Sequence, residues 1–136
     1  MGLLITGKEH EGTPAEAAGK SIALLRLMLG AGFLTAPRTL LRPALREPAG
    51  PSDEAVTVLR MLAGRELALA LGALLAARRS PHALRGWIEG GMLADTVDAL
   101  AMAQARSFKP TLRLLGLGSA ITAVAVGARV ARHLTT

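Results

Sequence analysis

Long apolar stretches alternate with short polar links along this 136-residue chain, and each stretch opens with a helix start signal. Thr13, Pro14 and Glu16 form a capping box that has proline in the first helical turn. Serine precedes the second and third stretches, and proline opens the fourth. These signals predict four helices, at residues 14–36, 53–79, 81–106 and 110–133.

The links between these helices predict the topology. Because the links around Ser80 and Lys109 are short, consecutive helices are expected to be antiparallel neighbours. The predicted fold class is all-α, an antiparallel four-helix bundle with a proline-broken link between the first and second helices. It is expected to form a single domain at residues 1–136, with a flexible N-terminal segment at 1–12.

The link at residues 37–51 has a pattern of its own. Arg38, Arg42 and Arg46 recur at every fourth position and alternate with leucine and alanine. Such a segment either lies in the plane of the lipid headgroups with its leucines toward the acyl chains, or is a proline-broken loop with solvated arginines. The sequence leaves both interpretations open.

Hydropathy favours a membrane location. The chain is 51% hydrophobic and has a mean hydropathy of +0.39, which is high for a protein that must keep a polar exterior. Each predicted helix exceeds the ~20 residues that cross a ~30 Å hydrocarbon core. Only the fourth has a long uncharged run, at 114–128, which is short for a span. We expect a multi-pass protein of the cell membrane, surrounded by the lipid bilayer, with a soluble bundle as the alternative.

Composition argues against several other classes. The net charge is +6, but only three aromatic residues accompany the basic side chains, so nucleic-acid binding is not expected. Without cysteine the chain has no thiolate nucleophile, and its three histidines lack metal-ligand spacing. No cofactor or metal is expected. The first residues are too short an apolar run for a cleavable signal peptide.

Five charged residues lie inside the apolar stretches: Arg26, Arg65, Glu66, Asp95 and Asp98. Charges within a membrane are costly, face the protein interior and mark functional sites. At ~1.5 Å per residue from each helix centre, four of the five lie at nearly one depth, and Asp98 lies at the level of Arg60. The charges predict three interior ion pairs, Arg65 with Asp95, Arg60 with Asp98, and Arg26 with Glu66. Since Arg65 and Glu66 point about 100° apart, they are expected to serve different neighbours.

Small residues recur at helical spacing beside the charges. In the second predicted helix they repeat at every fourth position, at Gly64, Ala68, Gly72 and Ala76. Small residues let helix backbones approach closely in lipid. Gly64 is therefore expected to lie in a helix contact, and Gly91, one turn before the aspartates, to leave space for the charged side chains.

Three functions are compatible with such a cluster. An acid–base pocket for a lipophilic small molecule would use one protonated and one ionised carboxyl group with arginine stabilising negative charge, and suits isomerisation, cyclisation or epoxide opening. Alternatively, the charges fasten the helices of a non-catalytic structural or partner-binding membrane subunit in a homo- or hetero-oligomer. A third hypothesis is proton-coupled transport of a small solute. The candidate catalytic residues are Asp95, Asp98, Arg65 and Glu66, and the candidate binding or supporting residues are Arg26, Arg60, Gly64 and Gly91.

Two of the predicted helices also carry motifs that resemble a known group of proteins. The motifs are Arg-Met-Leu-Ala-Gly-Arg-Glu-Leu-Ala-Leu at 60–69, Arg-Gly-Trp at 85–87 and Gly-Met-Leu-Ala-Asp-Thr-Val-Asp-Ala-Leu at 91–100. They resemble those of small, uncharacterised actinobacterial proteins with four predicted membrane helices. The resemblance covers about half of the chain, implies an integral membrane bundle and includes the same charged residues. It implies no particular reaction.

Overall fold

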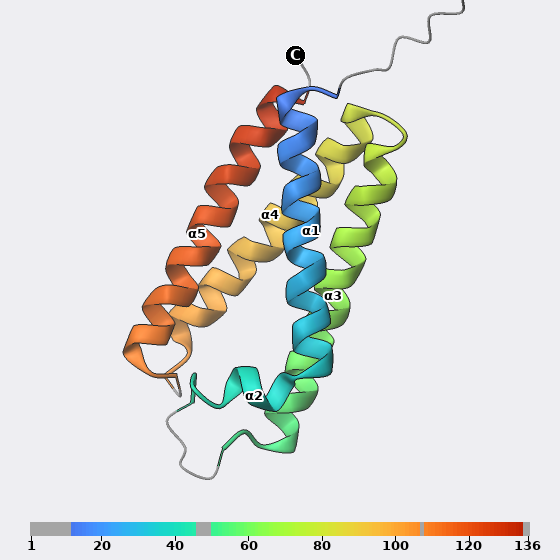
Figure 1. Cartoon of the computed structure of the whole chain (residues 1–136). Helices are drawn as coiled ribbons and strands as arrows, with labels where there is room; N and C mark the ends of the chain where they lie inside the picture. The colour runs from blue at the N-terminus through green and yellow to red at the C-terminus, as the bar shows by residue number, and fades with distance from the viewer. Residues whose placement is uncertain (1–11, 46–49, 107, 135–136) are drawn as a thin grey trace, which may run out of the picture.

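The structure, a computed structural model, describes residues 12–45, 50–106 and 108–134. These residues form five helices and no strand (Figure 1), namely α1 (Pro14–Thr35), α2 (Pro37–Leu41), α3 (Asp53–Ala77), α4 (Pro81–Gln104) and α5 (Pro110–His133). The all-helical prediction is confirmed for this part of the chain. The N-terminal segment up to residue 11 lies outside the described residues.

Local capping signals explain where α1, α3 and α4 begin, and α5 begins at Pro110 without a side-chain cap. Thr13 accepts a hydrogen bond from the backbone N–H of Glu16 at 3.2 Å, and the Glu16 carboxylate accepts one from the backbone N–H of Thr13 at 2.7 Å. Ser52 and Ser80 each accept from the backbone N–H three residues ahead. Each long helix ends at its predicted last residue or at most two residues before it. Differences of this size are common, because the last turn of a helix frays.

The proline-broken link contains the short helix α2, which the sequence did not predict. Pro37 is buried, and Arg38 donates to the Pro51 carbonyl at 3.0 Å and pairs with Asp53. Further along the link, the backbone N–H of Lys109 donates to the carbonyl of Ala44 at 3.3 Å. The link therefore crosses one end of the molecule, from α1 and α3 to the turn between α4 and α5 (Figure 1). Arg46 lies outside the described residues.

The long helices pack unevenly around the centre of the molecule. Consecutive long helices run antiparallel, as the short links predicted (Figure 1). α1 packs along α3, and α4 packs along α5, whereas α1 and α5 touch only sparsely. The molecule is therefore more open between α1 and α5 than between its other neighbouring helices.

The described residues have a small apolar core, many exposed large apolar side chains and two buried carboxylates. Among the described residues the only large side chain that is fully buried is Leu84, and alanines supply much of the core. Large apolar side chains are exposed on all four long helices, for example Met28 (73%), Met61 (71%), Leu93 (69%) and Leu114 (67%). Glu66 and Asp95 are instead buried. By length and composition, α1 and α5 are each able to cross a membrane.

The predicted small-residue contact on α3 is wrong at Gly64. Gly64 and Ala68 are exposed, and a Cβ at Gly64 would meet open space. In the middle of α3 the buried residues are Glu66 itself and the alanines Ala63, Ala70 and Ala73. Their spacing of three and four residues follows the 3.6-residue helical period, whereas a strict repeat of four drifts around the helix by about 40° at each step. The two later members of the predicted series do pack closely, since Ala76 is buried and Gly72 lies against the ring of Trp87.

Replacing Gly72 by alanine is expected to destabilise the protein, because the new Cβ would lie 2.4 Å from the Trp87 ring and displace the indole. We expect the free energy of unfolding to fall by about 1–3 kcal/mol, as measured by chemical unfolding in detergent micelles. Trp87 is the only tryptophan, so its fluorescence emission should shift in the same variant.

Gly64→Ala is the matched control on the same helix. Its Cβ meets nothing within 4 Å, so the higher helix propensity of alanine should raise stability by about 0.5–1 kcal/mol without moving the emission of Trp87. If the two variants changed stability and fluorescence equally, the close packing of Trp87 on α3 would be refuted.

Candidate functional site

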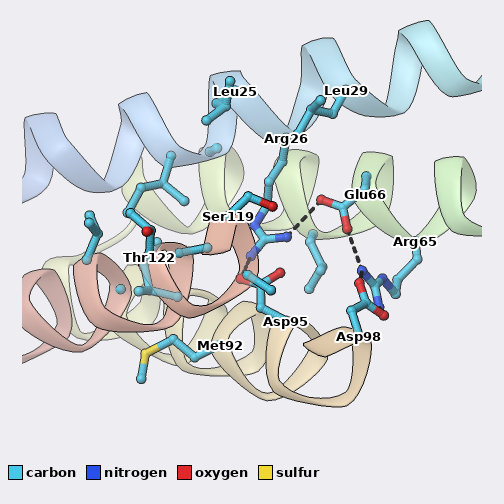
Figure 2. Close-up of a pocket in the computed structure, with 18 of the residues that line it drawn as sticks. Leu25, Arg26, Leu29, Arg65, Glu66, Met92, Asp95, Asp98, Ser119 and Thr122 are labelled. Atoms are coloured by element: carbon cyan, nitrogen blue, oxygen red, sulfur yellow. Dashed lines mark hydrogen bonds and ion pairs between the residues drawn. The ribbon is translucent and has the colours of Figure 1, made fainter. Parts of the chain in front are cut away.

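Arg26 of α1 reaches across the interior to both neighbouring helices. Its Nη1 donates to Oε2 of Glu66 on α3 at 2.8 Å, and its Nη2 pairs with Oδ2 of Asp95 on α4 (Figure 2). The side chain of Arg26 is only 12% exposed. One guanidinium group therefore bridges carboxylates from two different helices, and such charge-assisted hydrogen bonds are stronger than neutral ones.

Arg65 extends this network on the other side of Glu66. Its Nη2 donates to Oε1 of Glu66 at 2.7 Å, and its two terminal nitrogens bind Asp98 of α4 at 2.8 and 2.5 Å. The contact with Asp98 is bidentate, which fixes the relative orientation of the two groups. Figure 2 shows the resulting row of side chains, from Asp95 through Arg26, Glu66 and Arg65 to Asp98, which we call the charged row.

The structure confirms one of the three predicted ion pairs. Arg26 binds Glu66, but Arg65 pairs with Asp98 rather than Asp95. Arg60 is exposed and takes no part in the charged row, because six residues place it about 240° around α3 from Glu66. Arg65 and Glu66 do serve different neighbours, as expected, since Glu66 binds Arg26 of α1 and Arg65 binds Asp98 of α4. The long Arg65 side chain turns back to bind Glu66, which shares its two oxygens between two arginines.

The charges are buried to different degrees along the row. The side chains of Glu66 and Asp95 are 6% and 11% exposed, whereas those of Arg65 and Asp98 are 30% and 41% exposed. Among the described residues, Nε of Arg65 is the one buried side-chain atom without a hydrogen-bond partner. With Arg60 outside, three carboxylates face two guanidinium groups. The row carries one excess negative charge when all its members are ionised.

Gly91 gives Arg26 room to lie against α4. Gly91 is buried, and a Cβ at this position would lie 3.0 Å from Nη2 and 3.3 Å from Cζ of Arg26. The expectation that Gly91 leaves space for a charged side chain is therefore confirmed. Gly64, in contrast, has open space around it and does not support the row.

A cavity of about 610 Å³ adjoins the charged row. All four long helices contribute to its wall, which is mainly apolar, and the row supplies most of the polar groups. The apolar lining includes Leu62 and Leu69 of α3 and Ile88 and Met92 of α4. This volume is in the range of known small-molecule sites, about 300–1,000 Å³.

The cavity opens between α1 and α5. Leu25 and Leu29 line it from α1 and are 59% and 44% exposed, and Val126 lines it from α5 and is 44% exposed. Ser119 and Thr122 add hydroxyl groups on the α5 side, as Figure 2 shows. The sequence did not predict these residues as part of the site. The small residues on α5, such as Gly127, were the available signal that this helix packs closely on α4.

Asp95 is the member of the charged row best placed to meet a bound molecule. It lines the cavity, and its Oδ2 is bound by Arg26. Its Oδ1 accepts no hydrogen bond from the described residues and is not among their fully buried unpartnered atoms, so it keeps some accessible surface. Both oxygens of Glu66 and both of Asp98 are instead bound by arginine.

The three carboxylates also have the spacing of a cation site. Glu66, Asp95 and Asp98 each place one oxygen within 4.8 Å of the others. In this structure, however, Arg26 and Arg65 bind these carboxylates and occupy the space between them. The guanidinium groups supply the positive charge that a metal ion would supply in such a cluster.

Replacing Glu66 by glutamine is expected to lower the free energy of unfolding by about 3–5 kcal/mol, because it leaves two buried guanidinium groups without their shared carboxylate. The measurement is chemical unfolding in detergent micelles. Glu89→Gln is the matched control, since Glu89 is 48% exposed and pairs with Arg85 on the surface of α4. That change should cost about 1 kcal/mol or less, and a comparable loss in both variants would contradict the central position of Glu66.

Comparison with known proteins returns no match, whether to a family model, to a curated protein or to a solved structure. The resemblance to the actinobacterial membrane proteins stays a prediction, and the function is inferred from the geometry of the site.

Proposed function

We propose that this protein is a multi-pass membrane protein, an antiparallel four-helix bundle, that binds a lipophilic small molecule in its cavity and exchanges a proton with it through Asp95. The observation that carries the proposal is the free Oδ1 of a buried carboxylate at the wall of a large, mainly apolar cavity. Such a combination of apolar volume and one polar group of defined orientation is typical of ligand sites.

The exterior of the bundle supports the membrane part of the proposal. Apart from the charged row, each long helix has an uncharged stretch of 15–17 residues, at 21–35, 61–77, 90–104 and 114–128. At 1.5 Å per residue these stretches are about 22–26 Å long, a little less than a ~30 Å hydrocarbon core. The long side chains of Lys20 and Arg60 at the ends of two stretches are able to reach the headgroups.

The surroundings of Asp95 suit proton transfer. Arg26 holds Oδ2 and so fixes the direction in which Oδ1 points, while the Arg26 side chain is itself held by Glu66. A group whose orientation is fixed in this way is ready for reaction without reorganisation. We therefore assign Asp95 as the acid–base group, Arg26 and Glu66 as positioning residues, and Arg65 with Asp98 as their support. Isomerisation, cyclisation and epoxide opening all use such a group.

One observation favours a second candidate, a structural subunit. The charged row joins α1, α3 and α4, so the same ion pairs would hold the bundle together with no ligand present. In that case the cavity would have no role of its own, and Asp95 would matter only for folding. Proton-coupled transport, the third candidate, would use Asp95 as its proton carrier.

The membrane proposal predicts that the protein stays in the membrane fraction after alkaline carbonate washing and requires detergent for extraction. The chain has no cysteine, so single-cysteine variants report on individual positions. Cysteine at Leu93, which is exposed on the apolar exterior near the middle of α4, should resist maleimide in intact membranes, because a thiolate does not form in hydrocarbon, and should react after denaturation in detergent. A protein found in the soluble fraction, or full labelling of this cysteine in intact membranes, would refute membrane insertion.

The acid–base proposal predicts that Asp95→Asn abolishes proton exchange with the ligand while the protein still folds. The purified protein in lipid nanodiscs is incubated in D₂O with a total lipid extract of the producing cells, and deuterium uptake is followed by mass spectrometry. Wild-type protein should label at least one lipophilic species, and Asp95→Asn should reduce that labelling by about 100-fold or more.

Glu89→Gln should label the same species as the wild type, because Glu89 lies on the surface of α4. If Asp95→Asn instead failed to assemble and no species was labelled by the wild type, the structural candidate would be favoured. Uptake that was equal in wild type and Asp95→Asn would remove Asp95 from the proposed role.

A further inference from the structure

We infer that the ligand of this cavity is a lipophilic organic cation, an apolar body that carries one ammonium group, and that this group pairs with Asp95. The inference rests on the proposed function, since it concerns the same cavity, and it adds the chemical class of the ligand. Three features support it, namely the net charge of the charged row, the unpaired oxygen of Asp95 and the apolar lining of the cavity.

The charged row has one carboxylate more than it has guanidinium groups, so one further positive group would balance its charge. Asp95, Glu66 and Asp98 contribute three carboxylates, and Arg26 and Arg65 contribute two guanidinium groups. The other arginine expected inside, Arg60, is exposed on α3. A buried excess charge is costly in an apolar environment, and a cationic ligand would neutralise it.

Geometry places that excess at Asp95. Asp98 is bound at both oxygens by Arg65, and Glu66 is bound at one oxygen by each arginine. The one carboxylate oxygen of the row without a partner among the described residues is Oδ1 of Asp95, which is not fully buried and belongs to a residue that lines the cavity. A cationic group is therefore expected beside this oxygen, because Arg26 binds only the other oxygen of the Asp95 carboxylate.

The lining of the cavity selects a lipophilic body for this cation. Beyond the charged row, the wall consists of apolar side chains and two hydroxyl groups, and no further acidic or basic side chain lines it. Leu25, Leu29 and Val126 extend the apolar lining to the opening between α1 and α5. In a membrane this opening faces the acyl chains, so a ligand that lies in the bilayer is able to enter from the side.

Other ligand classes fit less well. An anionic lipid would bring a second negative charge to a row that already has one in excess, and like charges in an apolar site repel strongly. A neutral lipophile would leave the excess charge unpaired.

Trp87 provides a direct test, because it is the only tryptophan and lines the cavity. Bromine quenches tryptophan fluorescence at short range, so binding is measured with three probes of equal length, bromoundecyl-trimethylammonium, bromoundecanol and bromoundecanoate. Each is titrated into the protein in detergent micelles at neutral pH. We expect saturable quenching that is at least about ten-fold tighter for the cation than for the alcohol, with the carboxylate weakest.

Variants separate the charge of Asp95 from its contribution to folding. Asp95→Asn should bind the cation and the alcohol equally, whereas Asp95→Glu should keep the preference for the cation. Ala123→Phe fills the cavity from α5 and should abolish saturable quenching by all three probes, which controls for quenching from the micelle. If Asp95→Asn failed to fold, the relative affinities of the wild type for the three probes would still test whether the ligand is a cation.

The outcomes distinguish this inference from the proposed function. If the alcohol or the carboxylate bound to the wild type as tightly as the cation, the assignment of a cationic ligand would be overturned while the lipophilic pocket remained. If none of the probes gave saturable quenching, both would be overturned. A preference for the cation that survived in Asp95→Asn would refute the role of Asp95 in recognising it.

Discussion

The Glu66 carboxylate is the group on which the arrangement of three helices depends. One of its oxygens is bound by Arg26 from α1 and the other by Arg65 from its own helix, and these arginines continue to Asp95 and Asp98 on α4. A carboxylate this deeply buried is tolerated only when such partners are present. Apolar contacts alone do little to set the register, because the core is small and rich in alanine. Polar contacts therefore determine how α1, α3 and α4 align, as is common where lipid replaces water around helices.

The starts of the long helices were predictable because capping is local. Thr13 and Ser52 act within four residues of their own positions, so the sequence alone specifies them. The cost of burying charge likewise identified all five members of the charged row. The pairing inside the row was less accessible, because it depends on the reach of Arg65 and on the rotation of α3, which turned Arg60 outward. A pocket at these charges was one of the hypotheses drawn from the sequence, but its wall on α5 was not predicted, since it depends on how far α5 stands from α1.

The long helices pack unevenly, and this packing leaves a cavity beside the charged row. α1 lies closely on α3, and α4 on α5, but α1 and α5 meet only sparsely. If all four had packed equally, the free oxygen of Asp95 would have been covered by apolar side chains. The space that remains connects this carboxylate to the exterior through a mainly apolar passage. The same ion pairs thus hold the helices and, in the proposed function, also orient the one group that exchanges a proton.

The distances along the chain between the members of the charged row also affect how the protein is made. Arg26 is separated from Glu66 by 40 residues and from Asp95 by 69. During synthesis, α1 therefore emerges from the ribosome well before either of its acidic partners exists. In a membrane, its guanidinium group would have to wait near the headgroups or within the insertion machinery until α3 arrives. Biogenesis of this small bundle is thus expected to proceed by late joint entry of α1 and α3, with α4 completing the charge balance.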